Sequence, residues 1–230
     1  MITGLITAVV VSYFLGAIPT SIWVGKALQG VDVRNYGSGN AGATNTFRIL
    51  GWKAGTLVLT IDLIKGFTAA YFVGLLAFNL AGRPELLFGA QAVTLFQLIC
   101  GAVAVLAHMY PVYAGFRGGK GVITAVGMLL AIEPVSVALT LVVFLIILFT
   151  TRYVSLGSII GSVSYPLFLL LLRNQFGFDI ANTLLFISSA IAIVIIYKHR
   201  TNIQRLINGN ENRITSFKPS KGRLNEEQAT

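Results

Sequence analysis

The chain has 230 residues, of which 55% are hydrophobic and 11% charged, and its formal net charge is +9. Soluble domains carry about 25% charged residues, so this composition excludes an ordinary soluble domain and predicts a membrane protein. The basic residues lie between apolar segments rather than on an aromatic-rich polar face. The positive charge therefore indicates the orientation bias of membrane proteins, and we expect no nucleic acid partner.

Seven apolar segments follow one another and predict transmembrane helices. They lie at about residues 3–24, 55–78, 87–107, 122–132, 135–149, 154–172 and 180–197. The fourth has only about half of the 20 residues that a spanning helix needs, and Glu133-Pro134 after it predicts a turn between two short helices. A count of five or six helices stays open if the fourth and fifth segments form a re-entrant pair. We expect one domain over residues 1–217 and a disordered polar tail over 218–230.

Charge predicts the orientation of these helices. The first basic residue, Lys26, follows the first apolar segment, so this segment lacks the positive start of a cleavable signal peptide. The segments 25–54, 108–121, 150–153 and 198–230 carry 14 Lys and Arg residues, whereas the opposite side carries Arg83 and Arg173. The positive-inside rule then places these four segments in the cytoplasm. The sequence therefore predicts an all-α polytopic integral membrane protein with about seven transmembrane helices, its N-terminus outside and its C-terminus cytoplasmic.

The first of these segments contains a glycine-rich stretch, Asn35-Tyr-Gly-Ser-Gly-Asn-Ala-Gly-Ala-Thr-Asn-Thr-Phe-Arg48. Its glycines let the backbone turn sharply and approach a ligand, and Arg48 can bind a phosphate through two parallel hydrogen bonds. The alternative is a polar turn between two helices, but the density of Gly, Asn and Ser favours a binding site. The candidate residues are Ser38, Asn40, Thr44, Asn45 and Arg48.

The second glycine-rich stretch, Gly115-Phe-Arg-Gly-Gly-Lys-Gly121, leads directly into the fourth apolar segment. Gly118, Gly119 and Gly121 can present backbone N–H groups to an anion, Lys120 adds a point charge, and the following helix N-terminus adds a positive dipole end. The stretch lacks the spacing and the Lys-Ser/Thr ending of a Walker A loop.

A third polar stretch continues the last apolar segment. His199 and Asn202 fall on one side of a helix, which a merely basic stop sequence does not explain. Ser155, after Thr151-Arg-Tyr-Val, either joins the site or caps a helix. Asp62 and Lys65 lie three residues apart within a span, where a structural ion pair is the favoured interpretation.

Further polar features leave alternatives open. His108 ends the third apolar segment and is either a ligand contact or a helix cap. The single cysteine, Cys100, lies in an apolar run and reads as a small buried hydrophobic residue.

These blocks together resemble the acyl-phosphate-dependent glycerol-3-phosphate acyltransferases of bacterial inner membranes. The matching blocks are Gly37-Ser-Gly-Asn-Ala-Gly-Ala-Thr-Asn with Arg48, Gly115-Phe-Arg-Gly-Gly-Lys-Gly, and His199-Arg-Thr-Asn-Ile-Gln-Arg-Leu with Gly209 and Glu211. The resemblance covers about Ser12 to Arg213 and is specific because all blocks occur in order. It implies transfer of a fatty acyl group from acyl-phosphate to the sn-1 hydroxyl of glycerol 3-phosphate at the cytoplasmic face, which gives lysophosphatidic acid and phosphate.

The resemblance and the chemistry of two phosphate-bearing substrates suggest a role for each residue. We expect Ser38, Arg48, Lys120, His199 and Asn202 to be catalytic, with Gly118, Gly119 and Gly121 around a phosphate. Asn40, Thr44 and Asn45 are expected to orient the glycerol and the reacting carbonyl, Ser155 to bind substrate, and Glu211 to brace the third stretch. The expected partners are acyl-phosphate, glycerol 3-phosphate and membrane lipid, and we expect no metal or other cofactor.

Two other classes of function are compatible with parts of the sequence. A membrane transporter of a small phosphorylated metabolite also uses broken helices and glycine loops near charges. However, all three polar stretches are expected on one face of the membrane, and the apolar segments show no matching halves. A non-catalytic partner of lipid synthesis would leave many phosphate-suited groups without a purpose.

Overall fold

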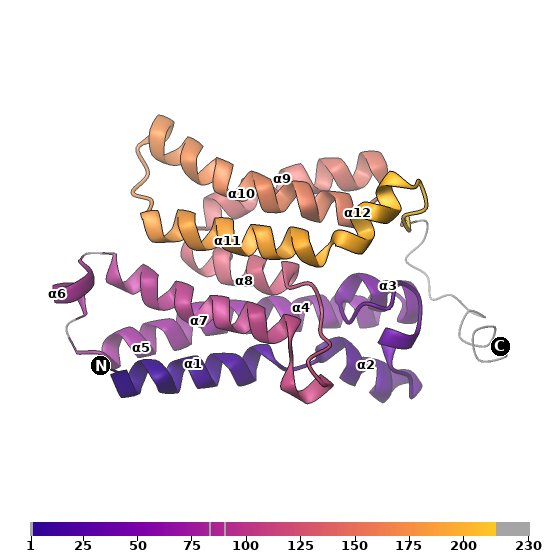
Figure 1. Cartoon of the computed structure of the whole chain (residues 1–230), viewed down its shortest axis with the longest axis horizontal. Coiled ribbons are helices and arrows are strands. Elements are labelled where there is room, and N and C mark those ends of the chain that lie inside the picture. The colour runs from indigo at the N-terminus through magenta and orange to yellow at the C-terminus, as the bar shows by residue number, and fades with distance from the viewer. Residues whose placement is uncertain (1, 83, 90, 215–230) are drawn as a thin grey trace.

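The computed structural model describes residues 2–82, 84–89 and 91–214, so the expected polar tail at 218–230 lies outside the described residues. The described chain is helical, and its long helices run side by side along one axis (Figure 1). The α-helices are α1 (Ile2–Gly16), α2 (Thr20–Gln29), α3 (Ala43–Leu50), α4 (Trp52–Thr68), α5 (Gly74–Leu80), α6 (Glu85–Phe88), α7 (Ala92–Met109), α8 (Val122–Ile132), α9 (Pro134–Thr151), α10 (Val154–Phe176), α11 (Asn182–Lys198) and α12 (Arg200–Ile207). A π-helical turn, η2 (Ala69–Val73), joins α4 to α5, and the short 3₁₀ turns η1 (Val33–Asn35) and η3 (Val112–Ala114) lie in loops.

Each of the seven predicted apolar segments contains helix among the described residues. Within the described residues, five helical segments are long and apolar enough to cross a membrane, and the bent pair of α11 and α12, at 57°, makes a sixth. The remaining apolar helix, α8, coincides with the predicted segment 122–132, and its 11 residues are too few to span a bilayer alone. The expected turn at Glu133-Pro134 is confirmed, because Pro134 begins α9 and the Glu133 carboxylate accepts from the N–H groups of Val135 and Ser136.

The short helix α8 packs closely between its neighbours because glycines remove side chains from the contact. A Cβ at Gly66 of α4 would lie 2.0 Å from the Thr124 carbonyl oxygen, and one at Gly127 of α8 would lie 2.0 Å from the Leu63 carbonyl oxygen. Small residues at such positions let helix backbones approach each other in a membrane. This packing fixes the position of the N-terminus of α8, which bears on the site described below.

The first apolar segment is broken between α1 and α2 at Ile18-Pro19. The Ile18 carbonyl oxygen, which the break leaves without a helical partner, accepts a hydrogen bond from Lys65 Nζ at 3.0 Å. Lys65 also forms a buried ion pair with Asp62, at 2.8 Å. The predicted structural ion pair is therefore confirmed. Asp62 neutralises the lysine whose hydrogen bond satisfies the Ile18 carbonyl at the helix break.

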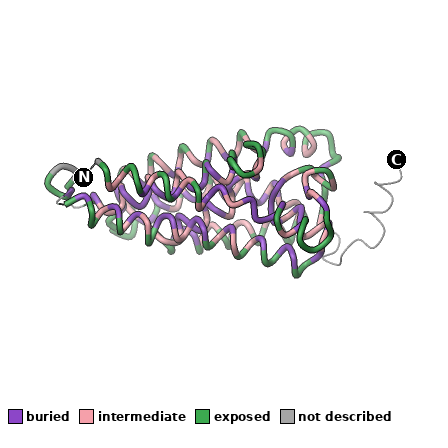
Figure 2. Tube along the Cα trace, turned by 90° about the horizontal axis from the view of Figure 1, so that it is seen from below, coloured by how far each residue is buried: buried purple, intermediate pink, exposed green. Residues whose placement is uncertain are grey.

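The two ends of the bundle differ. The N-terminus and α6 lie at one end, whereas α2, α3, α12 and the loop between α7 and α8 gather at the other (Figure 1). Exposed residues follow the outside of the bundle (Figure 2), and many are large and apolar, among them Leu141, Ile146 and Phe149. An apolar exterior of this kind suits lipid as the surrounding solvent. The polar stretches of the sequence thus meet at one end of the apolar bundle.

Candidate active site

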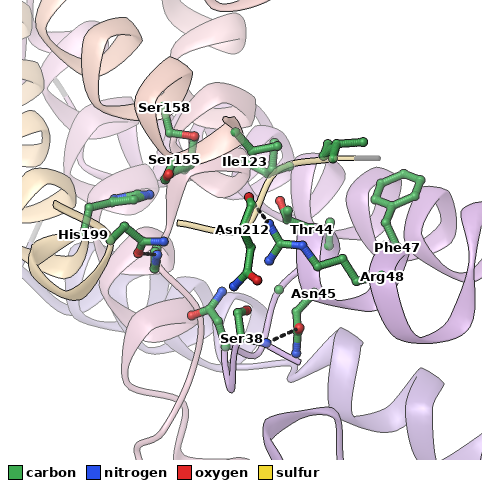
Figure 3. A pocket seen from close by; sticks show the side chains of 18 of the residues that line it. Ser38, Thr44, Asn45, Phe47, Arg48, Ile123, Ser155, Ser158, His199 and Asn212 are labelled. Atoms are coloured by element: carbon green, nitrogen blue, oxygen red, sulfur yellow. Dashed lines mark hydrogen bonds between the residues drawn. The ribbon is translucent and has the colours of Figure 1, made fainter. Parts of the chain in front are cut away.

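A cavity of about 640 Å³ opens at the polar end of the bundle. It lies between α3, α8, α10, the junction of α11 and α12, and the segment that follows α12 (Figure 3). The predicted site residues that line it are Ser38, Asn40, Thr44, Asn45, Arg48, Lys120, Gly121, Ser155, His199 and Asn202. Residues from the three polar stretches, together with Ser155 of α10, therefore surround one space.

Three helix N-termini meet at this cavity. The lining includes the first residues of α3, α8 and α10, namely Ala43, Thr44, Val122, Ile123, Val154 and Ser155. The first N–H groups of a helix have no partner within the helix, and the helix dipole places positive potential there. Three such ends around one cavity favour an anion such as phosphate.

Cationic side chains add to this positive potential. Arg48, Lys120 and Arg213 all line the cavity. An Nη atom of Arg48 donates to the Asn212 carbonyl oxygen at 3.2 Å, and Lys120 Nζ donates to Asn202 Oδ1. Burial lowers the pKa of Lys120 to about 8, because the ammonium loses water contacts that the nearby Glu211 charge only partly replaces. A phosphate at this position would restore the missing counter-charge.

Asn45 lines the cavity, and its amide also positions the neighbouring loop. Its side chain is fully buried, and Nδ2 donates to the carbonyl oxygens of Val33 and Tyr36 at 2.8 and 3.1 Å. Its Oδ1 accepts from the Ser38 N–H at 2.9 Å. Both donor hydrogens of the amide are thus committed to the loop. Asn45 fixes the backbone that carries Ser38 toward the cavity.

The structure also corrects the role expected for two glycines. Gly118 and Gly119 do not line the cavity, and their N–H groups donate to the carbonyl oxygens of Met109 and His108 at 3.2 and 3.1 Å. A Cβ at Gly118 would lie 2.0 Å from the His108 carbonyl oxygen, and one at Gly119 would lie 2.2 Å from His108 Nε2. These glycines permit close packing, whereas Lys120 and Gly121 after them reach the cavity.

Glu211 braces the third polar stretch, as the sequence predicted. Its buried carboxylate accepts from Ser155 Oγ at 3.1 Å and Asn202 Nδ2 at 2.8 Å through one oxygen. The other oxygen pairs with Arg205 Nε at 3.0 Å. Glu211 therefore joins α10 to α12 and orients the Asn202 amide, whose oxygen accepts from Lys120.

His199 is buried at the junction of α11 and α12. Its Nδ1 lies 2.8 Å from the Ile195 carbonyl oxygen, and since a carbonyl can only accept, Nδ1 carries the proton in this contact. Nε2 is then the nitrogen available to a ligand. The ring is oriented by a neutral backbone group, not by a carboxylate.

A second histidine, His108, also lines the cavity together with Asp62. His108 Nδ1 lies 3.7 Å from Asp62 Oδ1, which also accepts from Thr20 Oγ1 at 3.0 Å and pairs with Lys65. The cavity contact of His108 was one of two open alternatives. The carboxylate nearest to a histidine is therefore already shared by a lysine and a hydroxyl.

Sequence reasoning did not select several cavity residues. Asn212 and Arg213 follow Glu211 directly, and the Arg213 guanidinium lies over the Tyr153 ring, with Nε donating to the hydroxyl at 2.9 Å. The sequence signal that could have identified them is their position directly after Glu211, which the family resemblance includes. Ser158 lies one turn beyond Ser155 on the same face of α10, which a helical spacing of three or four residues indicates.

A second, apolar cavity of about 120 Å³ adjoins the first between α8, α9, α10 and α11. The two cavities share Val122, Ile123, Phe144 and Ser158. The polar cavity thus continues into a space lined mainly by hydrocarbon. Among the residues that the structure describes, no group of three or more His, Cys, Asp or Glu side chains could hold a metal ion.

A polar cavity whose groups suit phosphate, beside an apolar one, is typical of a membrane enzyme or carrier of phosphorylated lipids. Comparison with known proteins identifies which of these two classes the chain belongs to. The sequence profile described as Glycerol-3-phosphate acyltransferase matches residues 6–209. The chain therefore belongs to the glycerol-3-phosphate acyltransferase family, as an integral membrane, multi-pass member. This identifies an acyltransferase, not the transporter or the non-catalytic partner considered above.

Individual relatives agree with this assignment. The chain is 47% identical to the Glycerol-3-phosphate acyltransferase of Salinibacter ruber, over 96% of this chain and 97% of the relative. It is 43% identical to that of Chlorobaculum tepidum, over 90% and 95%.

Solved structures show the same fold. A crystal structure of PlsY, an integral membrane glycerol 3-phosphate acyltransferase, in its glycerol 3-phosphate form, superposes with a TM-score of 0.77 at 40% identity, over 91% of this chain and 95% of that one. The lysophosphatidic acid form of PlsY gives a TM-score of 0.74 at 39% identity, over 91% and 94%.

Proposed function

We propose that this acyltransferase transfers a fatty acyl group from acyl-phosphate to the sn-1 hydroxyl of glycerol 3-phosphate, giving lysophosphatidic acid and inorganic phosphate. The observation that carries the proposal is one polar cavity with three helix N-termini, Arg48 and Lys120, continuous with an apolar cavity. Both proposed substrates carry phosphate, and the donor also carries an acyl chain. Glycerol 3-phosphate and lysophosphatidic acid name the two forms of the PlsY crystal structures.

The donor is the part of the proposal that most needs a test. The sequence contains no His-x4-Asp pair of the kind used by soluble-loop acyltransferases, since neither His108 nor His199 has an Asp five residues later. Purified protein should convert acyl-phosphate and labelled glycerol 3-phosphate to labelled lysophosphatidic acid. Equal turnover with acyl-CoA or acyl carrier protein as the donor would contradict the assignment.

Side chains in the cavity bind and orient the two substrates. We assign Ser38, Arg48 and Lys120, with the amides that begin α8, to the phosphate groups. His199 Nε2 and Asn202 orient the glycerol and the reacting carbonyl, with Asn40, Thr44 and Ser155 nearby. Charged hydrogen bonds to phosphate contribute roughly 1.5–3 kcal/mol each, so these contacts are sufficient to hold both substrates in register.

The acyl transfer then proceeds without a dedicated base on the protein. The sn-1 oxygen attacks the carbonyl carbon, the bond from that carbon to the phosphate oxygen breaks, and the departing phosphate takes the hydroxyl proton. An acyl-phosphate is already activated, and its phosphate can accept a proton. The contact at His199 Nδ1 supports a reaction without a protein base. A catalytic histidine is usually oriented by a carboxylate, whereas His199 Nδ1 contacts the Ile195 carbonyl.

We infer that the site faces the cytoplasm of a bacterial inner membrane. The charge bias favours this orientation because the basic segments lie at the same end as the cavity. Single cysteines at Ser38 and Arg205 should resist labelling by an impermeant thiol reagent from outside intact cells. A cysteine at the exposed Gln175, at the other end of α10, should react and serves as the control; native Cys100 is buried. Labelling at 38 or 205 would reverse the orientation.

A further inference from the structure

The apolar cavity extends away from the polar site along four helices. Its opening is formed by Val122, Ile123, Phe144 and Ser158, which line both cavities. α8 and α10 begin at the polar end, whereas α9 and α11 end there. The cavity is therefore a continuation of the reaction site into the bundle, and the proposed donor has one part that suits it, the acyl chain.

The cavity has an identifiable end. On each helix one lining residue is farthest from the polar end; these residues are Leu129, Val137, Tyr165 and Ser188. Leu129, Val137 and Tyr165 are buried and belong to one packed core. From Ser158 at the opening to Tyr165 is seven residues of α10, or about 10 Å at 1.5 Å per residue. A chain that runs along α10 from the opening therefore meets buried core side chains at about this distance.

Tyr165 is the largest of the residues at this end. Its side chain is 4% exposed, and its hydroxyl has no hydrogen-bond partner among the described residues. Buried hydroxyl groups normally have partners, and an unpaired one costs free energy, so the hydroxyl does not stabilise the core through a hydrogen bond. Tyr165 is the last residue of α10 that lines the cavity, and one turn beyond it Leu169 is fully buried and does not line the cavity.

The room in front of Tyr165 depends on a glycine. Gly161 lines the cavity one turn before Tyr165, and a Cβ built there would lie 3.4 Å from Thr140 Cγ2 of α9. This is close to an ordinary contact, so a small side chain could be accommodated there while filling the cavity. Glycine within a helix is less favourable than alanine, and here its lack of a side chain leaves space for a ligand.

We propose that Tyr165 is the residue that sets the longest acyl chain the enzyme uses efficiently, and that Gly161 keeps the path to it open. The inference rests on the proposed function in one respect, that the donor acyl chain occupies the apolar cavity. A chain that ends before Tyr165 buries every methylene, whereas a longer one must displace the ring or bend. Each methylene that the cavity can no longer bury should lower kcat/KM roughly fourfold.

The test measures kcat/KM for a series of donors of increasing chain length, with glycerol 3-phosphate as acceptor. Tyr165→Ala should move the optimum to longer chains than in the wild type, and Gly161→Val should move it to shorter ones. Tyr165→Phe should keep the wild-type optimum because the ring remains. Tyr165→Leu, a smaller truncation, serves if Tyr165→Ala does not fold.

Leu169→Ala is the matched control. It opens a void in the same core one turn beyond Tyr165, so it should lower the melting temperature without changing the preferred chain length. Unchanged optima in both Tyr165→Ala (or Tyr165→Leu) and Gly161→Val, or an equal shift in Leu169→Ala, would overturn the proposal. The series is run with acyl-phosphates and with acyl-CoAs. Turnover with acyl-CoA alone would contradict the proposed donor, and the shift of the optimum would still decide the role of Tyr165.

Discussion

The two glycine-rich loops of the site have similar compositions, but their glycines have different structural roles. In the first, residues 35–42, the backbone turns through Gly37 and Gly39 at positive φ, and Ser38 and Asn40 reach the cavity. In the second, residues 115–121, Gly118 and Gly119 are packed against the end of α7, and their N–H groups are bonded to it. Only Lys120 and Gly121 of the second loop line the cavity.

This difference shows that a glycine can serve either turning or close approach. A positive φ favours glycine because a Cβ is strained there, whereas at Gly118 a Cβ would collide with the His108 carbonyl oxygen. The second loop therefore acts as a support that places Lys120 and the N-terminus of α8 at the cavity. The predictions below test this distinction, beginning with the largest expected effect.

The strongest test compares two glycines of the second loop. Gly118→Ala would place a Cβ 2.0 Å from the His108 carbonyl oxygen, so the loop must move, and we expect loss of both folded protein and activity. Gly115→Ala meets no heavy atom within 4 Å and only suffers a φ of +62°, which costs about 1–2 kcal/mol. In thermal unfolding in detergent, Gly115→Ala should therefore have a much higher melting temperature than Gly118→Ala. Equal melting temperatures would mean that Gly118 is not needed for packing.

The next largest effect concerns the cation that each loop region supplies. Arg48→Ala and Lys120→Ala should each lower kcat/KM at least about ten- to a hundredfold while the protein stays folded, because a charged hydrogen bond to phosphate is lost. Arg48→Lys should fail to restore activity, since lysine lacks the two-pronged geometry. Lys53→Ala removes an exposed cation after α3 and should be neutral. Activity near the wild-type level in either alanine variant would remove that residue from the site.

Much of the fold could be predicted because apolar length and helix-end signals are local. The range 122–132 was predicted because Gly121 before it and Glu133-Pro134 after it set both ends of α8. The roles of Gly118, Gly119 and Asn45 could not be predicted in the same way. A motif shows which donors a loop has, whereas the end of α7 and the turn at Val33 and Tyr36 decide which partners they find.

The pH dependence sharpens the role of Lys120. Burial lowers its pKa to about 8, so the ammonium that we propose binds phosphate is present below this pH and is lost above it. We expect kcat/KM to be level below pH 8 and to fall by up to tenfold per unit above it. Lys120→Arg keeps its charge throughout, so this alkaline limb should disappear even if the maximal rate is lower. Lys53→Arg should retain the limb, and persistence of the limb in Lys120→Arg would assign it to another group.

The smallest expected effect concerns His199, which belongs to neither glycine-rich loop. If the departing phosphate takes the hydroxyl proton, His199 only orients a substrate through Nε2, and glutamine can offer a hydrogen-bonding group in a similar place. His199→Gln should therefore keep a measurable fraction of the activity, within about tenfold of the wild type for one neutral hydrogen bond, and more than His199→Ala keeps. The pH profile of His199→Gln should have the same level shape below pH 8 as that of the wild type. Suppose instead that both variants are inactive with glycerol 3-phosphate binding intact, and that an acidic limb near the reference histidine pKa of about 6.5 is present only in the wild type. His199 would then be the general base, and the two glycine-rich loops would serve mainly to hold the phosphates in place for it.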